Sequence, residues 1–241
     1  MKITITTLLL LVAFSNYGQQ FEEKLDPFNK LIVDPYINVE LVQGNEEKIQ
    51  VFYDNVDPAE IISEQRGKTL YVYLADAKIG WRILANDNYR YKKYRYAEVK
   101  MVITYKSLKN IQFRGEEQLT CEDEISGSRL KLKAYGETDI RIASIDIRRL
   151  KIALYGENNL LVSAGSTYDQ KINTYGENRV DASMLQSYGT NTKSFGENKV
   201  AVNASQYLRA MYFGEGELRY SGHPIMERKW LIGEVDVRKV R

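Results

Sequence analysis

Apolar residues alternate with polar or small ones over much of the second half of the chain, which is the two-residue period of a β-strand. In the stretch LKIALYGENNLLV, every second residue from Leu150 to Leu154 is aliphatic, and Leu160 and Val162 continue the apolar face beyond a turn. The i, i+3, i+4 spacing of an amphipathic helix is absent from this stretch. The pattern therefore predicts short strands joined by tight turns.

The same pattern recurs at a nearly constant interval, marked by a glycine followed by a glutamate. The marking glycines are separated by 21, 20, 20, 20, 18 and 19 residues, and they are Gly115, Gly136, Gly156, Gly176, Gly196, Gly214 and Gly233. An aliphatic residue follows four positions after each glycine, at Leu119, Ile140, Leu160, Val180, Val200, Leu218 and Val237. One such unit cannot bury its apolar face alone, so neighbouring units must stack.

The repeat predicts an all-β fold, a single-stranded right-handed parallel β-helix with about 20 residues per coil. The right hand follows from the strong preference of parallel strand connections. Equivalent residues on successive coils would lie about 4.8 Å apart. Each glycine then marks a corner with positive φ or close backbone approach. The aromatic residues before the glycines would form a stacked column, and a ladder of hydrogen-bonded amides would be formed by Asn158, Asn178 and Asn198.

The glutamates that follow the glycines are the first candidate binding site. Two unit charges about 4.8 Å apart repel by roughly 1 kcal/mol in water, and splayed side chains and basic neighbours such as Arg179 would offset this cost. The other interpretation is that the column binds divalent cations or a cationic partner, and carboxylate oxygens suit calcium. The candidate binding residues are Glu137, Glu157, Glu177 and Glu197, and the candidate calcium ligands are Glu157, Glu177 and Glu197.

Residues 27–110 lack the Gly-Glu mark but still contain strand patterns, and no Pro- or Ser-rich linker separates them from the repeat. We therefore expect a single β-helix domain over residues 19–241, with 27–110 as N-terminal coils or a cap and 111–241 as the Gly-Glu repeat coils. Residues 1–18 are predicted to be a signal peptide, with Lys2 before an apolar run from Leu8 to Phe14 that is too short for a comfortable membrane span. The chain is thus expected to be exported to the periplasm, the cell surface or the medium, and not to be an integral membrane protein.

A second candidate binding site is the stretch WRILANDNYRYKKYRYAEVK, which mixes basic and aromatic residues. Such a mixture suits stacking on bases or sugars and neutralisation of acidic polymers. Export and a net charge of only +2 argue against nucleic acid, so an acidic glycan or an anionic cell surface is the expected partner. The other interpretation is an exposed loop or hairpin that protects a coil. The candidate residues are Trp81, Tyr91, Lys92, Lys93 and Arg95.

Few residues qualify for catalysis. Cys121 is the only cysteine and His223 the only histidine, so an intrachain disulfide is excluded. The place of Cys121 in an aliphatic column predicts a small buried hydrophobe. Glycosidases need one pair of carboxylates across a bound sugar, whereas this chain repeats an acid on every coil. No nucleophile elbow, phosphate loop or zinc-ligand spacing occurs, so no catalytic residue is assigned, and calcium is the only cofactor considered.

The sequence resembles the head domain of putative autotransporter-type adhesins, also called the head GIN domain, from exported proteins of Bacteroidetes-like bacteria. The resemblance covers residue 27 to about 235 and rests on FNKLIVDPYINVELVQGNEEKIQVFYDN, GKTLYVYL, SLKNIQFRGEEQL and the glycine-marked coils. Members often carry a small residue after the repeating glycine, where this chain has glutamate. The resemblance implies a right-handed β-helix related to pectin-lyase-like folds and an adhesive role without established catalytic residues.

These features favour a non-catalytic exported β-solenoid that binds a glycan, another surface polymer or a cell-surface protein. The alternative is a carbohydrate-active enzyme, a lyase or hydrolase, acting on an acidic polysaccharide. A groove with a non-repeating cluster of carboxylates or of Lys and Arg would favour the enzyme. A surface that repeats from coil to coil would favour binding.

Overall fold

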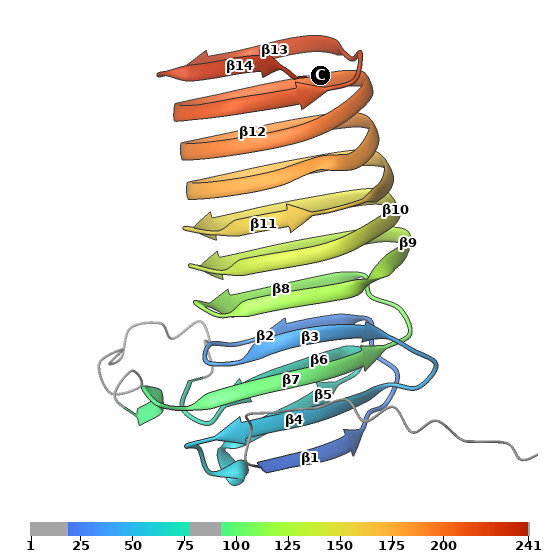
Figure 1. Cartoon of the computed structure of the whole chain (residues 1–241), viewed down its shortest axis with the longest axis vertical. Coiled ribbons are helices and arrows are strands. Elements are labelled where there is room, and N and C mark those ends of the chain that lie inside the picture. Colours follow the sequence, from blue (N-terminus) through green and yellow to red (C-terminus); the bar gives the residue numbers. More distant parts are fainter. Residues whose placement is uncertain (1–18, 78–92, 241) are drawn as a thin grey trace, which may run out of the picture.

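The computed structural model describes residues 19–77 and 93–240, which form a tall stack of strands (Figure 1). The predicted signal peptide, residues 1–18, lies outside the described residues. The strands up to residue 115 are β1 (Gln19–Lys24), β2 (Lys30–Val33), β3 (Asn38–Gln43), β4 (Lys48–Asp54), β5 (Ile61–Arg66), β6 (Thr69–Leu74), β7 (Glu98–Tyr105) and β8 (Asn110–Gly115), with a 3-10 turn, η1 (Pro58–Glu60), before β5. The strands that follow are β9 (Gln118–Gly136), β10 (Asp139–Gly156), β11 (Asn159–Val162), β12 (Gly165–Ser221), β13 (Ile225–Ile232) and β14 (Val235–Lys239).

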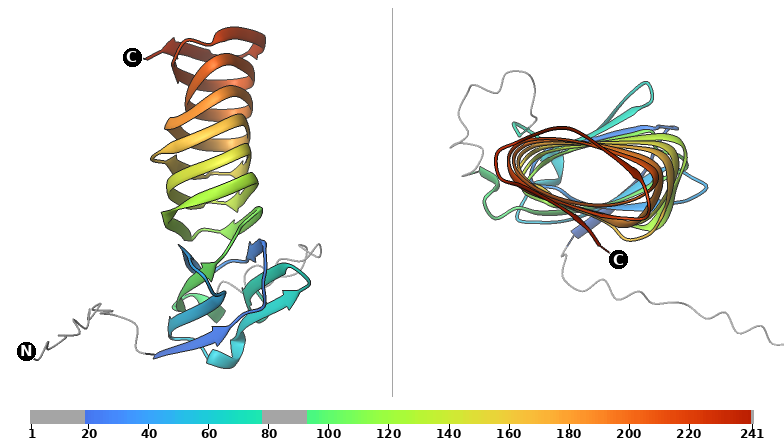
Figure 2. Two further views of the ribbon diagram at one scale, coloured as in Figure 1. Left: turned by 90° about the vertical axis from the view of Figure 1, so that its right-hand side faces the viewer. Right: turned by 90° about the horizontal axis from the view of Figure 1, so that it is seen from above.

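Successive Gly-Glu units pair as parallel strands, so that each coil lies directly on the preceding one. Tyr155 of β10 is level with Tyr135 of β9 and with Tyr175 of β12, one coil of 20 residues away in each direction. Seen along the long axis, the coils superpose as one flattened ring (Figure 2, right). This arrangement confirms the predicted parallel β-solenoid with about 20 residues per coil.

The interior of the solenoid is filled by columns of aliphatic side chains. One column is at most 2% exposed along its length and consists of Leu119, Ile140, Leu160, Val180, Val200 and Leu218, as predicted. A single cluster of buried hydrophobic residues extends from Leu25 to Leu218. Burying each large aliphatic side chain contributes about 1.5–3 kcal/mol. Because the coils stack directly on one another and share this core, each coil depends on its neighbours for stability.

The N-terminal strands form both parallel coils and an antiparallel end. Strand β2 pairs in parallel with β6 and β8, and β3 pairs in parallel with β7 and β9. Strand β4 instead runs antiparallel to β1 and β7, and β5 runs antiparallel to β6. These antiparallel strands lie at the base of the stack (Figure 1). They cover the strands that would otherwise present unpaired backbone groups at that end.

The corner glycines have a steric reason to recur. All seven glycines of the Gly-Glu pairs have φ between +99° and +125°, a region that other residues rarely adopt. A Cβ atom on Gly176 would lie 2.5 Å from the carbonyl oxygen of Gly156 on the preceding coil. The obstacle is backbone, which cannot move without disturbing the stack. Both roles predicted for the glycine, positive φ and close backbone approach, are confirmed.

The predicted asparagine ladder is also present, inside the corner. The Asn158 amide donates to Oδ1 of Asn178 at 2.9 Å, and the Asn178 amide donates to Oδ1 of Asn198 at 3.0 Å. All three side chains are at most 3% exposed. The Thr138 hydroxyl donates to Oδ1 of Asn158 at 2.7 Å and so begins the ladder on the preceding coil. The buried amides of this ladder are thus satisfied by their own repetition.

Candidate functional site

The predicted glutamate column is an exposed corner of the solenoid. Glu137, Glu157, Glu177 and Glu197 are all exposed, and none forms an ion pair within the described part of the chain. A shallow depression of ≈ 430 Å³ follows the column, and it is lined by Glu157, Asn158, Asn159, Glu177, Asn178, Arg179, Glu197 and Lys199. Two cations therefore line the same depression as the three acids and moderate their repulsion.

The arrangement of these acids gives calcium no ready-made cage. Within residues 19–77 and 93–240, no group of three or more His, Cys, Asp or Glu side chains is placed to hold a metal ion. Calcium takes six to eight oxygen ligands around it, whereas a straight column offers carboxylates from one side only. Calcium binding at Glu157, Glu177 and Glu197 stays a prediction, and a direct test is described below.

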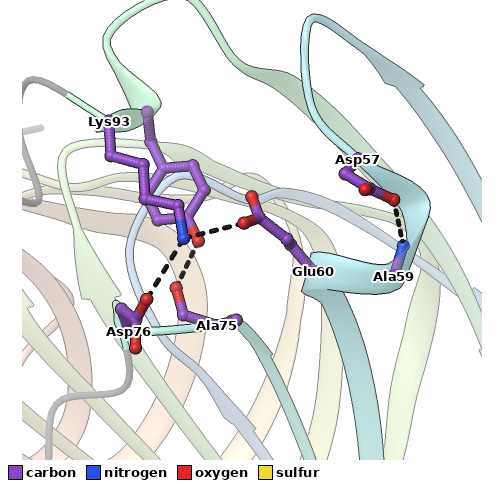
Figure 3. A network of polar contacts seen from close by, with 7 residues as sticks. Asp57, Ala59, Glu60, Ala75, Asp76 and Lys93 are labelled. Atoms are coloured by element: carbon purple, nitrogen blue, oxygen red, sulfur yellow. Dashed lines mark hydrogen bonds and ion pairs between the residues drawn. The ribbon is translucent and has the colours of Figure 1, made fainter.

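In the basic and aromatic stretch, the structure places Lys93 and Arg95, while Trp81, Tyr91 and Lys92 lie outside the described residues. The Lys93 amine lies between two carboxylates, 2.7 Å from Oε1 of Glu60 and 3.1 Å from Oδ2 of Asp76 (Figure 3). The hydrogen bond with Glu60 is the main cause that raises the pKa of Lys93. Its charge is thus used inside the protein, where it fastens this segment to η1 and to the end of β6.

Of the side chains that follow Lys93, one is buried and anchors the segment, and the next two are exposed. Tyr94 is 2% exposed, and its hydroxyl donates to the carbonyl of Ala75. Arg95 is exposed, and its guanidinium lies 5.4 Å from the centre of the Tyr96 ring. Tyr96 is itself 72% exposed. Of the described residues in this stretch, Arg95 and Tyr96 are therefore the pair best placed to meet a partner.

A stacked column of aromatic rings runs up the outer face of the coils, as the repeat predicted. The ring centres are 4.9 to 5.2 Å apart, and the planes are within 6° of parallel, for Tyr135, Tyr155, Tyr175, Phe195 and Phe213. Each ring is partly buried. Because the rings cover one another face to face, it is their edges that remain for solvent or a ligand.

A column of lysines runs beside these rings, and sequence reasoning missed it. Lys131, Lys151 and Lys171 are level with one another on three successive coils. Lys133 adjoins them, and its amine donates to the Tyr135 hydroxyl at 3.2 Å. The charge of Lys133, above other causes, lowers the pKa of Lys131. The signal in the sequence was the 20-residue recurrence of lysine at outward positions of the repeat.

The reactive side chains between the N-terminal part and the first Gly-Glu coil have structural partners. Glu117 accepts a hydrogen bond from the Tyr36 amide at 2.7 Å, and burial raises the pKa of its carboxyl group. Cys121 is 1% exposed, as predicted, and burial raises the pKa of its thiol. A buried neutral thiol is a poor nucleophile, so Cys121 is not placed to act as one. His223, near the C-terminus, is exposed and precedes Pro224.

Solved structures that share this fold include two putative adhesins and a putative lipid binding protein. A putative adhesin from Bacteroides fragilis NCTC 9343 is 19% identical with a TM-score of 0.75, over 92% of this chain and 96% of that chain. A putative adhesin from Parabacteroides distasonis ATCC 8503 is 14% identical with a TM-score of 0.70, over 92% and 96% of the two chains. A putative lipid binding protein from the same strain is 16% identical with a TM-score of 0.61, over 93% and 98%. At these identities the likeness concerns the fold alone.

The remaining comparisons concern the membrane and the family. Among the described residues, no helix is both long and apolar enough to cross a bilayer. No curated protein matches the chain. The family model described as putative auto-transporter adhesin, head GIN domain, matches residues 27–224, which is most of the chain and includes the N-terminal coils and all but the last Gly-Glu pair. The chain therefore belongs to the family of putative auto-transporter adhesins with a head GIN domain.

Proposed function

We propose that the protein is a non-catalytic, exported binding protein that attaches to a polymer or a protein at a cell surface through the outer faces of its coils. One observation carries the proposal: side chains with binding chemistry repeat on successive coils at the same outward positions. Lys131, Lys151 and Lys171 repeat in this way, and so do the glutamates of the corner. A row of equal weak contacts gains strength by multivalency when the partner also repeats.

A catalytic function needs a different arrangement. An active site joins a nucleophile or base, its orienting partner and a stabiliser of developing charge at one point. The depression along the glutamate corner is instead lined by the same residue types from three successive coils. Membership in a family of putative adhesins supports binding as the role. The expected export agrees with this role, because such a partner lies outside the cell.

The proposal is tested by presenting immobilised residues 19–241 to an array of glycans and to surface extracts of neighbouring cells. We expect retention of at least one polymer or surface protein, with the polymer recovered at its original length. Product chains of reduced length, or new chain ends that accumulate with time, would overturn the proposal in favour of a lyase or hydrolase. Failure to retain any glycan or surface component would also count against it.

A further inference from the structure

The outer face that carries the aromatic column also carries a group of six lysines. We call it the lysine face, and it consists of Lys30, Lys131, Lys133, Lys151, Lys171 and Lys193. Lys30 of β2 is level with Asn110 of β8, which is level in turn with Lys131. The column thus continues from the N-terminal coils into the repeat. All six side chains are partly or fully exposed.

The positive charge of the lysine face is not neutralised by the described carboxylates. No ion pair joins any of the six lysines to a carboxylate within residues 19–77 and 93–240. The lysines repel one another instead, and the charges of Lys151 and Lys193 contribute, after burial, to a lowered pKa of Lys171. The chain carries a net charge of only +2, so this face concentrates a field that the molecule as a whole lacks. An anionic partner would relieve the repulsion.

One end of the lysine face is hollowed. A depression of ≈ 120 Å³ is lined by Lys30, Asn110, Ile111, Gln112, Lys131 and Lys133. Three ammonium groups and two amides therefore surround it, and no carboxylate does. When the Gln112 amide is turned so that its oxygen accepts hydrogen bonds from the Arg114 guanidinium, its amino group is left as a donor. Since water occupies about 30 Å³ per molecule, the depression has room for a carboxylate or sulfate group.

The shape of the face indicates an extended polymer. The lysines follow the solenoid axis at the strand spacing of about 4.8 Å, so they match a straight chain with closely repeated charges. Ammonium groups are hydrated point charges and suit dispersed anions, whereas bidentate recognition of one anion favours arginine. The hydroxyl groups of Tyr135, Tyr155 and Tyr175 lie alongside and can bond to sugar hydroxyls.

A lipid surface fits this face less well. Membrane-bound surfaces combine basic residues with apolar side chains that enter the acyl region. Of the large hydrophobic side chains that are exposed, Trp230 and Ile232 lie beside Phe213 at the C-terminal end of the aromatic column. The others are Phe21, Tyr96, Leu161, Tyr168, Met184, Tyr188, Ile225 and Val240. The outward positions beside the lysines hold Ala153 and Asn173 instead. Polar contacts along a flat basic face are what a hydrated polyanion requires.

We propose that the lysine face binds an acidic polysaccharide laid along the solenoid axis, with one carboxylate or sulfate group seated among Lys30, Lys131 and Lys133. This inference rests on the proposed binding function and names its partner class. The polymer contributes one anionic group for every one or two coils. Binding is electrostatic in origin, so it weakens as salt screens the charges.

The test measures binding of residues 19–241 to polygalacturonic acid, dextran sulfate and neutral dextran, at low and at high salt. The face variant is Lys131→Gln, Lys151→Gln and Lys171→Gln together. The control variant loses the same charge from other exposed positions, through Lys24→Gln, Arg148→Gln and Lys239→Gln. We expect the face variant to lose about tenfold or more in affinity for at least one acidic polymer, as for other proteins that lose several polyanion contacts. The control variant should stay close to wild type.

A second pair of variants tests the seat at the end of the face. Lys133 lines the depression and Lys193 does not, so Lys133→Gln should weaken binding more than Lys193→Gln. Equal losses would overturn the seat. These single substitutions on the surface should leave the melting temperature nearly unchanged, which keeps the test valid if the triple variant folds poorly.

The outcomes separate this inference from the proposed function. Binding of neither acidic polymer, or equal losses in the face and control triples, overturns the lysine face as the site. Retention of a neutral glycan or of a surface protein would leave the proposed function standing in that case. Shortening of the acidic polymer by the wild-type protein would instead overturn the non-catalytic function itself.

Discussion

Replacing Asn178 by alanine measures how much the asparagine ladder stabilises the solenoid. Its amide donates to Asn198 Oδ1 at 3.0 Å and to the Tyr175 carbonyl at 3.2 Å, and its oxygen accepts from the Asn158 side chain at 2.9 Å. Alanine leaves at least two buried groups without partners, the Asn158 amide and the Asn198 oxygen. Each unsatisfied buried polar group costs about 1–3 kcal/mol, so the substitution should destabilise the protein by roughly 2–6 kcal/mol.

Asn198 provides a matched control at the end of the same ladder. The next coil carries Gly216 at that level, close to the Asn198 backbone, so the ladder has no further amide to contact. In Asn198→Ala the Asn178 amide keeps its bond to Tyr175, and the cost should fall to roughly half that of Asn178→Ala, about 1–3 kcal/mol. Glu177→Gln, on the exposed corner beside the ladder, should leave stability unchanged.

The stabilities are compared by urea unfolding followed by circular dichroism, using the shift of the midpoint. Solenoids can unfold in parts because each coil contacts only its neighbours, so hydrogen exchange of the Asn158 and Arg179 amides provides a local measurement. Equal midpoints for Asn178→Ala and Asn198→Ala would refute the reasoning. So would a loss below about 1 kcal/mol for Asn178→Ala, since it would mean that other groups replace the ladder.

Four further outcomes follow from the same contacts. Gly176→Ala should lower the urea midpoint more than Gly67→Ala, because a Cβ on Gly67 meets nothing within 4 Å whereas one on Gly176 meets backbone; equal shifts would contradict the steric explanation. Val180→Asp places a charge at a position 1% exposed and should yield aggregated or unfolded protein; a wild-type melting temperature would contradict the register. Burial raises the pKa of Glu117, so its contribution to stability is present below about pH 4.3 and is lost as pH rises. Glu117→Gln should therefore flatten the pH dependence of the free energy of unfolding above that pH, and an unchanged slope would contradict it. If calcium bridges Glu157, Glu177 and Glu197, it should raise the melting temperature at fixed ionic strength. An unchanged melting temperature would mean that these side chains contact solvent and bind no calcium.

The interior and the corners of the coils could be predicted from the sequence because every coil meets the same local constraint. A glycine is required where a Cβ would meet the backbone of the preceding coil, as at Gly176. An asparagine that recurs at the same level of successive coils forms a hydrogen bond with the equivalent asparagine of the next coil, as Asn158 does with Asn178. Such constraints act between equivalent positions of successive coils. The 20-residue interval in the sequence therefore predicts which residues are in contact.

The candidate site was less predictable because ion pairs join positions that no repeat relates. Lys93 stood among basic and aromatic residues in the sequence, but its partners Glu60 and Asp76 come from other segments of the N-terminal part. Only the folded chain shows that its charge is already used. The lysine column was harder to see, because Asn110 interrupts it and Lys30 belongs to a strand without the Gly-Glu mark.

The columns of repeated side chains differ in whether their hydrogen bonds and charges are satisfied within the protein. This difference separates columns with a structural role from columns that could bind a partner. Inward polar groups such as the Asn178 amide have their hydrogen bonds within the ladder, and the fold explains them fully. The outward lysines repel one another by roughly 1 kcal/mol per close pair in water, and the fold does not require them. Ala153 stands level with Lys133, so this outward column does not carry a lysine on every coil. A column of like charges that stays unpaired within the described residues is therefore one that a bound anion would stabilise.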